Sequence, residues 1–281
     1  MTPNDRDNRE DDLVTYAVAN GVATLTLNRP EQKNAWTVAM EHRYFALLDR
    51  ATEDPGVRVL LVTGAGSAFC PGMDMRALSS SSTSGTGLDR SGRRPMNTPL
   101  SVPKPMIAAI AGPCAGLGLM QACMCDVRFA ARGARFSTSF ARRGLSAEYA
   151  MGWLLPRLIG VEHALDLLLS GRVFDAEEAH RIGLVSRLCE PDELLPRARV
   201  YAEDLAANCS PSAMGAIRHQ VLAYQDLDLQ SASDHSVTLM HHYNASEDFR
   251  EGVASFVEKR KPHFAPWKPL PKGVDPRGIV R

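Results

Sequence analysis

Apolar residues fall into two kinds of segment in the N-terminal half of the chain. Some segments are alternating or continuously apolar over four to six residues, as strands are, and others have apolar side chains at helical spacing. The predicted strands are residues 14–18, 22–27, 57–62, 106–111 and 127–130. The predicted helices that lie between them are residues 37–52 and 117–125.

Turn residues separate these segments in a way that fixes the fold class. Asn20-Gly21 suits the positive φ angles of a tight hairpin turn, so the first two strands are expected to pair with each other. The later strands are apolar on both faces, which is typical of strands covered by helices on both sides. The pattern therefore predicts an α/β core.

The second half of the chain is mostly helical. Asp175 and Glu178 have the spacing of a capping box, Gly183 is a stop signal, and Ser210-Pro211 places a cap residue before a first-turn proline. After residue 205 the pattern predicts only helices. We therefore expect a core over residues 1–205 and a C-terminal helical region over residues 206–281.

Composition excludes several classes of protein. The 281 residues are 44% hydrophobic, enough for a substantial core, and 32 basic residues balance 32 acidic ones. No net field therefore draws the chain to nucleic acid or to an anionic membrane. The charged N-terminus has no signal-like apolar region and no stretch reaches a membrane span, so a cytoplasmic location is expected.

The cysteines and histidines predict no metal site. The six cysteines lack C-x-x-C spacing, and reduced, buried thiols are their expected state in the cytoplasm. His235, His241 and His242 do not form the i, i+4 pair of a helical metal site. Neither a metal nor a redox cofactor is expected.

A serine-rich stretch over residues 79–94 has little to bury and is expected to be a loop. Two interpretations stay open for it. It is either an insertion without a role or a segment beside the substrate.

The glycine-rich stretch GAGSAFCPGMDM, residues 64–75, allows three interpretations. A dinucleotide site fails, because Phe69 stands where the third glycine of G-x-G-x-x-G belongs. A nucleophile at Cys70 has no histidine nearby in the sequence, although a remote one could reach it on folding. The third interpretation is a turn whose main chain points an unpaired N–H into a cavity.

A second glycine-rich stretch, residues 111–119, lies between a buried strand and a helix. A helix N-terminus leaves its first N–H groups unpaired and stabilises an anion there. Two such donors from separate turns would form an oxyanion hole, although glycines at these turns also serve close packing.

Several segments in a fixed order resemble the crotonase, or enoyl-CoA hydratase/isomerase, superfamily over nearly the whole chain. These segments are ATLTLNRPEQKNA, GAGSAFCPGMDM, PMIAAIAGPCAGLGLMQACMCDVRFA, GLSAEYAMGWLLPRLIG, IGLVSRL and SEDFREGVASFVEKRKPHF. The resemblance implies a spiral of repeated β-β-α units and coenzyme A (CoA) thioesters as substrates. It also implies that the C-terminal helices assemble a homotrimer or a dimer of trimers.

The resemblance also implies roles for particular residues. The oxyanion-hole amides would be those of Cys70 and Leu117, with Gly72 and Gly116 beside them. The adenine end of CoA would lie near Ala68, Met73 and Asp74. Apart from the resemblance, Lys33, Lys259 and Arg260 either meet the CoA phosphates, the last two from a neighbouring subunit, or form a solvated cluster, which is the default interpretation.

The catalytic carboxylates are where the chain departs from typical hydratases. Their two glutamates correspond to Met120 and Phe140, which cannot transfer protons. The segment Gly144-Leu-Ser-Ala-Glu148 matches isomerase-type members that carry one glutamate there, so Glu148 is the catalytic candidate. Tyr149 and Trp153 nearby would desolvate it partly, which favours a raised pKa.

The prediction is an acyl-CoA enzyme of fatty acid metabolism that stabilises a thioester enolate and moves protons through Glu148. Isomerisation of a double bond needs one base, whereas hydration, a lyase reaction, needs another group to position water. Two alternatives stay open. One is a CoA-thioester-binding protein without catalysis, and the other is a different reaction of the superfamily, such as thioester hydrolysis or dehalogenation.

Overall fold

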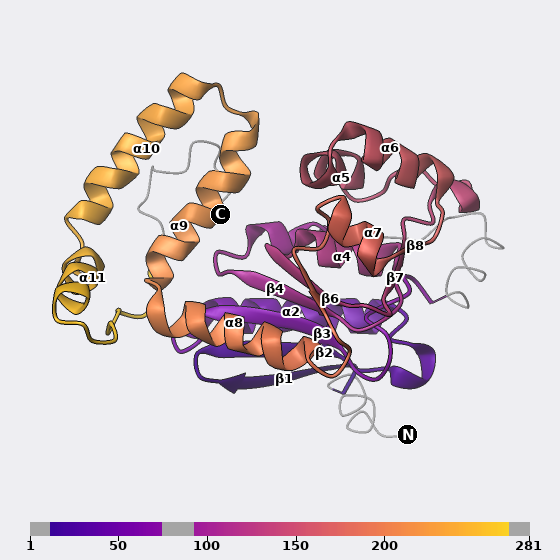
Figure 1. Ribbon diagram of the computed structural model, residues 1–281, viewed down its shortest axis with the longest axis horizontal. Helices are drawn as coiled ribbons and strands as arrows, with labels where there is room; N and C mark the ends of the chain where they lie inside the picture. Colours follow the sequence, from indigo (N-terminus) through magenta and orange to yellow (C-terminus); the bar gives the residue numbers. More distant parts are fainter. Residues whose placement is uncertain (1–11, 75–92, 270–281) are drawn as a thin grey trace.

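The computed structural model describes residues 12–74 and 93–269 (Figure 1). Residues 79–92 of the predicted serine-rich loop lie outside the described residues. The strands are β1 (Val14–Ala19), β2 (Val22–Leu27), β3 (Val59–Gly64), β4 (Met106–Ile110), β5 (Cys114–Ala115), β6 (Val127–Ala131), β7 (Arg135–Ser137), β8 (Phe174–Asp175) and β9 (Arg187–Cys189). The helices are α2 (Val38–Glu53), α4 (Leu117–Met124), α5 (Met151–Ile159), α6 (Val161–Ser170), α7 (Ala176–Arg181), α8 (Leu194–Asn208), α9 (Pro211–Ala223), α10 (Leu229–Asn244) and α11 (Glu247–Val257).

The main sheet has the strand order β1-β2-β3-β4-β6-β9. β1 and β2 form the predicted antiparallel hairpin, whose turn residues Asn20 and Gly21 have φ angles of 51° and 77°. Every later pair in this sheet is parallel. The loops that follow β3 and β4 therefore leave the sheet at the same edge, where a site can form between them.

The continuously apolar strands are buried on both faces, as predicted. In β3, Val59 and Leu61 pack on one face against α8, while Leu60 and Val62 pack on the other face in the cluster that contains α2 and α4. Successive side chains of a strand point to opposite faces, so a strand buried on both sides is apolar at every position. A smaller sheet, β5-β7-β8, stands beside the main one.

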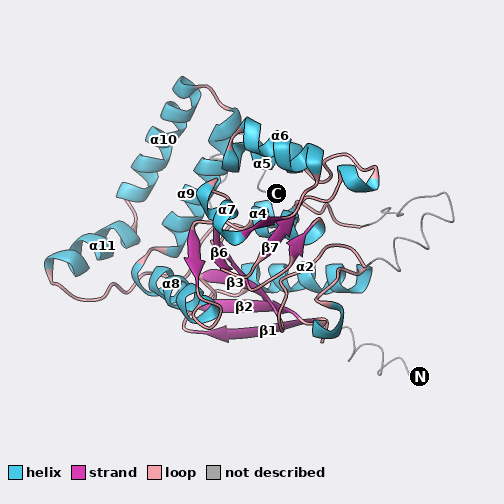
Figure 2. Cartoon of the chain, turned by 45° about the vertical axis from the view of Figure 1, so that its right-hand side comes forward, coloured by secondary structure: helices cyan, strands magenta, loops and turns pink. Residues whose placement is uncertain are grey.

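The C-terminal helices leave the core after α8. The predicted boundary at residue 205 falls within α8, which continues to Asn208 and packs on the main sheet. α9 begins at the predicted cap, where Ser210 Oγ accepts from the Ala213 N–H at 3.2 Å. α10 and α11 extend away from the sheet (Figures 1 and 2) and expose apolar side chains such as Leu229 and Phe256.

Within the described ranges, no helix combines the length and the apolar character needed to cross a membrane.

Candidate active site

The turn after β3 is fastened to the segment that leads into α4. The Cys70 N–H donates to the Pro113 carbonyl at 3.1 Å, and the Cys70 carbonyl accepts from the Ala115 N–H at 2.9 Å. Cys70 and Cys114 thus form a one-residue parallel bridge. The prediction that the Cys70 amide is open to a thioester oxygen is wrong, because that amide is used to join the two turns.

The Cys70 side chain is equally unsuited to nucleophilic catalysis. It is completely buried, and burial raises the pKa of the thiol to about 12. The thiolate is the reactive form of cysteine, so Cys70 is un-ionised at neutral pH. The Cys70 side chain packs in the main core beneath the turn.

Two glycines bring the turns into contact at their ends. Gly72 and Gly116 both have positive φ angles, 106° and 48°. A Cβ atom on Gly72 would lie 3.7 Å from Gly116 Cα, and one on Gly116 would lie 3.9 Å from Gly72 Cα. The peptide groups that follow these glycines are those of Met73 and Leu117, which are thereby held near each other.

The N–H groups of Met73 and Leu117 donate to no hydrogen-bond acceptor in the described part of the chain. Leu117 is the first residue of α4, whose N–H groups have no partner inside the helix. A helix N-terminus also carries partial positive charge. Met73 and Leu117 therefore have two main-chain donors that an anionic oxygen could accept from. The resemblance places Met73 at the adenine end of CoA instead.

A buried network holds the strand segment beside Met73. Trp36 donates its N–H to the Gly72 carbonyl at 2.8 Å and accepts from the Asp74 N–H at 2.9 Å, so its main chain grips both sides of Met73. The Trp36 indole N–H donates to Glu41 Oε2 at 3.4 Å. This indole and this carboxylate are completely buried.

Arg93 compensates the buried charge of Glu41. Its Nε and Nη2 donate to the two carboxylate oxygens at 3.0 Å and 2.5 Å, in a two-pronged ion pair. Such geometry gives direction as well as energy to the pair. Sequence reasoning missed both residues, although Glu41 interrupts the apolar stripe of α2 between Met40 and Tyr44, which was the available signal.

Glu148 lies in a tightly bent segment before α5. Tyr149 and Ala150 follow it with φ angles of 46° and 68°, a conformation that costs a non-glycine residue roughly 1–2 kcal/mol. The Glu148 carbonyl accepts from the Met151 N–H at 3.0 Å, and Tyr149 and Trp153 pack on the core. The Glu148 side chain is half-buried, and α5 itself packs against α4.

The positions of the two typical glutamates are apolar in the structure as well. Met120 is completely buried and Phe140 is 5% exposed, and both belong to the main core. Neither side chain carries a group that could activate a water molecule. Among the predicted catalytic residues, Glu148 is the one that carries a carboxyl group.

Of the predicted CoA contacts, Ala68 and Asp74 are bonded to other residues of the chain, whereas Lys33 is exposed. Ala68 is buried and its carbonyl accepts from the Asn34 side chain at 2.8 Å, so this residue belongs to the frame of the turn. Asp74 is paired with Arg29 at 3.2 Å. Lys33 is exposed in the loop that also contains Asn34, and its ammonium group makes no ion pair with the described residues.

Arg260 is occupied by carboxylates of its own subunit. It pairs with Glu251 at 2.6 Å and with Glu258 at 2.5 Å, and its hydrogen bonds to Glu251 lower the pKa of that carboxyl to about 2. A guanidinium group compensated in this way is a poor partner for a CoA phosphate. Lys259 beside it has a positive φ angle of 53° and stays a prediction.

The sequence matches a known protein family and several known relatives. The family described as enoyl-CoA hydratase/isomerase matches residues 17–266. A relative from Escherichia coli named 1,2-epoxyphenylacetyl-CoA isomerase is 33% identical, over 90% of this chain and 98% of its own length. (E)-benzylidenesuccinyl-CoA hydratase from Thauera aromatica is 34% identical, over 89% and 98%.

Solved structures agree as well. The enoyl-CoA hydratase of Mycobacterium tuberculosis superimposes with a TM-score of 0.80 at 30% identity, over 90% of this chain and 99% of that one. The matched residues include both turns and the segment that carries Glu148. The chain belongs to the enoyl-CoA hydratase/isomerase family, the crotonase superfamily, and is an enzyme of that family.

Proposed function

We propose that this enzyme isomerises the double bond of an enoyl-CoA thioester. The thioester oxygen accepts hydrogen bonds from the Met73 and Leu117 amides, and the Glu148 carboxylate moves the proton. Lys33 meets a phosphate of CoA. The reaction uses the chain's own groups and CoA as part of the substrate.

The proposed steps balance with a single carboxylate. Glu148 takes a proton from the α-carbon of a 3-enoyl thioester, and the electron pair of that C–H bond forms the enolate, whose oxygen the two amides stabilise. The enolate then collapses as the protonated Glu148 returns its proton to the γ-carbon, which gives the 2-enoyl thioester. Each amide of such a pair contributes on the order of 3 kcal/mol to the transition state.

The observation that carries this proposal is the pair of open amides on two touching turns. Gly72 and Gly116 are in contact, and the next N–H in each turn has no acceptor among the described residues. The apolar Met120 and Phe140 favour isomerisation over hydration, because hydration needs a second polar group to orient water. Glu148 alone suffices for moving a proton between two carbons.

The test is a product analysis with the purified enzyme. A 3-enoyl-CoA is expected to become the 2-enoyl-CoA, seen as the absorbance of the conjugated thioester, without release of free CoA. Conversion of a 2-enoyl-CoA to the 3-hydroxy product would instead support hydration. Release of free CoA would identify thioester hydrolysis.

A second candidate is a CoA-thioester-binding protein without catalysis, which the loss of both typical glutamates favours. It would bind acyl-CoA but leave every enoyl-CoA unchanged. Calorimetry of a saturated acyl-CoA, run beside the product analysis, separates the two functions.

We further propose that α10 and α11 assemble the enzyme into a trimer. Their exposed apolar side chains include Leu229 at 88% and Phe256 at 84% exposure, on helices that stand away from the core (Figure 1). Several large exposed apolar side chains on neighbouring helices are typical of a protein interface. Native mass spectrometry should show a trimer or a hexamer, and Phe256→Asp should shift it towards monomer.

A further inference from the structure

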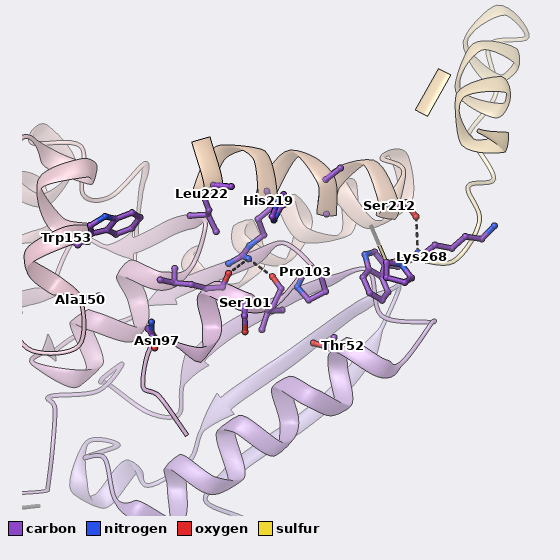
Figure 3. A pocket seen from close by; sticks show the side chains of 18 residues that line it. Thr52, Asn97, Ser101, Pro103, Ala150, Trp153, Ser212, His219, Leu222 and Lys268 are labelled. Carbon is purple, nitrogen blue, oxygen red and sulfur yellow. Dashed lines mark hydrogen bonds between the residues drawn. The ribbon is translucent and has the colours of Figure 1, made fainter. Parts of the chain in front are cut away.

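A cavity of about 600 Å³ lies between α9, α5 and the short helix η2 (Thr98–Ser101) (Figure 3). This volume is within the range of sites that bind small molecules. Its walls are largely apolar and include Leu100, Ala150, Trp153, Ala216, Leu222 and Trp267. None of these residues has a role in the two-turn geometry described above.

One end of the cavity is lined by a residue close in sequence to the candidate acid. Ala150, two residues after Glu148, lines it, and Figure 3 shows Ala150 and Trp153 together at this end. Ser212 and Lys268 lie at the opposite end in the same view. The cavity therefore leads from the Glu148 segment along α9 towards the C-terminal part of the chain.

Two cationic side chains, Arg218 and Lys268, line the cavity, and Arg218 is already compensated. Arg218 Nε donates to both oxygens of Asp126 at 2.9 Å. Its Nη1 donates to the carbonyls of Leu100 and Val102, and its Nη2 donates to that of Pro99. With its charge paired and its donors used, Arg218 offers little to a second carboxylate at the end of an acyl group.

Trp267, in the segment after α11, lines the cavity and packs on α9. An added Cβ on Gly215 would lie 3.0 Å from the Trp267 indole nitrogen, so the ring rests directly on α9 at this glycine. The next residue is fixed by a hydrogen bond from the Lys268 N–H to Ser212 Oγ at 2.9 Å. The tail of the chain thus forms the outer wall of the cavity.

We propose that this cavity receives the far end of the acyl group, and that the enzyme prefers extended apolar acyl-CoA thioesters to four-carbon ones. The inference rests on the proposed function for the position of the thioester. Each methylene that leaves water for an apolar wall strengthens binding about fourfold. An acyl group of about ten carbons gains from the cavity, whereas a four-carbon group ends near Glu148.

The test fills the cavity from α9. Leu222 lines it, whereas the neighbouring Val221 does not and is 60% exposed, so Leu222→Trp and Val221→Trp form a matched pair. We expect Leu222→Trp to lower kcat/KM for a ten-carbon 3-enoyl-CoA at least about tenfold and to change the value for a short one less than about twofold. Val221→Trp should leave both unchanged.

Equal responses of the two variants, or equal use of both chain lengths by the wild type, would overturn the inference. Calorimetry distinguishes this from a failure of the proposed function. The wild type should bind saturated decanoyl-CoA at least about tenfold more tightly than acetyl-CoA, and Leu222→Trp should lose that difference. If this holds while no enoyl-CoA is converted, the function is wrong and the cavity assignment stands.

Discussion

The amide side of the candidate site is fastened at many points, whereas the segment that carries Glu148 is largely exposed. The turn after β3 is hydrogen-bonded to the segment before α4, to Trp36 and to Asn34. Residues 141–147, in contrast, are exposed throughout. The two amides therefore lie in a frame fixed by many hydrogen bonds, whereas the proposed acid follows a solvent-exposed segment.

This contrast indicates at which positions a side chain can be substituted without loss of the proposed chemistry. A main-chain N–H binds an oxyanion whatever its side chain, so Met73 and Leu117 can occupy positions with no chemistry of their own. In the proposed mechanism the proton transfer depends on one carboxylate, that of Glu148. Changes to Glu148 should therefore act on catalysis alone, whereas changes to the frame should act on catalysis and folding together.

The largest effect is expected for Glu148→Gln. The amide side chain keeps the shape but takes no proton, so kcat for a 3-enoyl-CoA should fall by about a thousandfold or more. Steady-state kinetics measures this, and calorimetry should show acyl-CoA affinity changed less than about threefold. Glu162→Gln, an acid in the first turn of α6, is the control and should keep full activity. An active Glu148→Gln variant would move the chemistry to another residue.

A smaller effect is expected when the frame is bent at Gly116. Its φ of 48° and ψ of −120° are unfavourable for alanine, so Gly116→Ala should rotate the peptide that presents the Leu117 N–H. We expect kcat to fall about thirtyfold, part of the contribution of one amide. Gly133→Ala is the matched control, because Gly133 has no positive φ and nothing within 4 Å of its added Cβ. Similar kinetics for the two variants would remove Leu117 from the mechanism.

The network behind Met73 should give a smaller kinetic effect with a clear loss of stability. Glu41→Gln leaves the buried Arg93 guanidinium without a compensating charge, which costs roughly 3 kcal/mol of unfolding free energy. Because Trp36 would lose the carboxylate that its indole N–H donates to, kcat should fall about fivefold at unchanged KM. The kinetics are measured below the lowered melting temperature of the variant.

Asp49→Asn provides the control for that experiment. Asp49 lies on the same helix and pairs with Arg94, but both side chains are about half exposed, so the pair contributes at most about 1 kcal/mol. Its kcat and melting temperature should stay close to those of the wild type. A fivefold fall in kcat for both variants would assign the effect to helix α2 in general.

The sequence predicted the frame better than the choice of donor within it. Strand and hairpin positions follow from local periodicity and from Asn20-Gly21, and they agree with the structure within a few residues. Whether Cys70 or Met73 has the open amide depends on the Pro113 carbonyl, which a distant segment brings to Cys70. No local pattern contains that information.

The acid side shows a related limit. The motif at residues 144–148 pointed to Glu148, but the left-handed Tyr149 and Ala150 are not residues that favour such a conformation, and surrounding packing imposes it. Of the Glu41–Arg93 pair, the sequence showed only Glu41, as a charge on an apolar helix face. Its partner lies far along the chain, so only the fold could reveal the pair.

The smallest effect is expected for Cys70→Ala, which separates a structural from a chemical role for this residue. Alanine keeps the main-chain bonds to Pro113 and Ala115, so kcat should change less than about twofold and iodoacetamide at pH 7.5 should leave the wild type active. The pKa of the thiol is raised from 9.0 to about 12 by burial, so between these values the unfolded chain releases its proton first and stability falls as pH rises. Cys70→Ala should lessen that fall in urea titrations at pH 8 and pH 10. Loss of turnover in a folded Cys70→Ala variant would restore the thiol as a catalytic group and break the division between frame and acid.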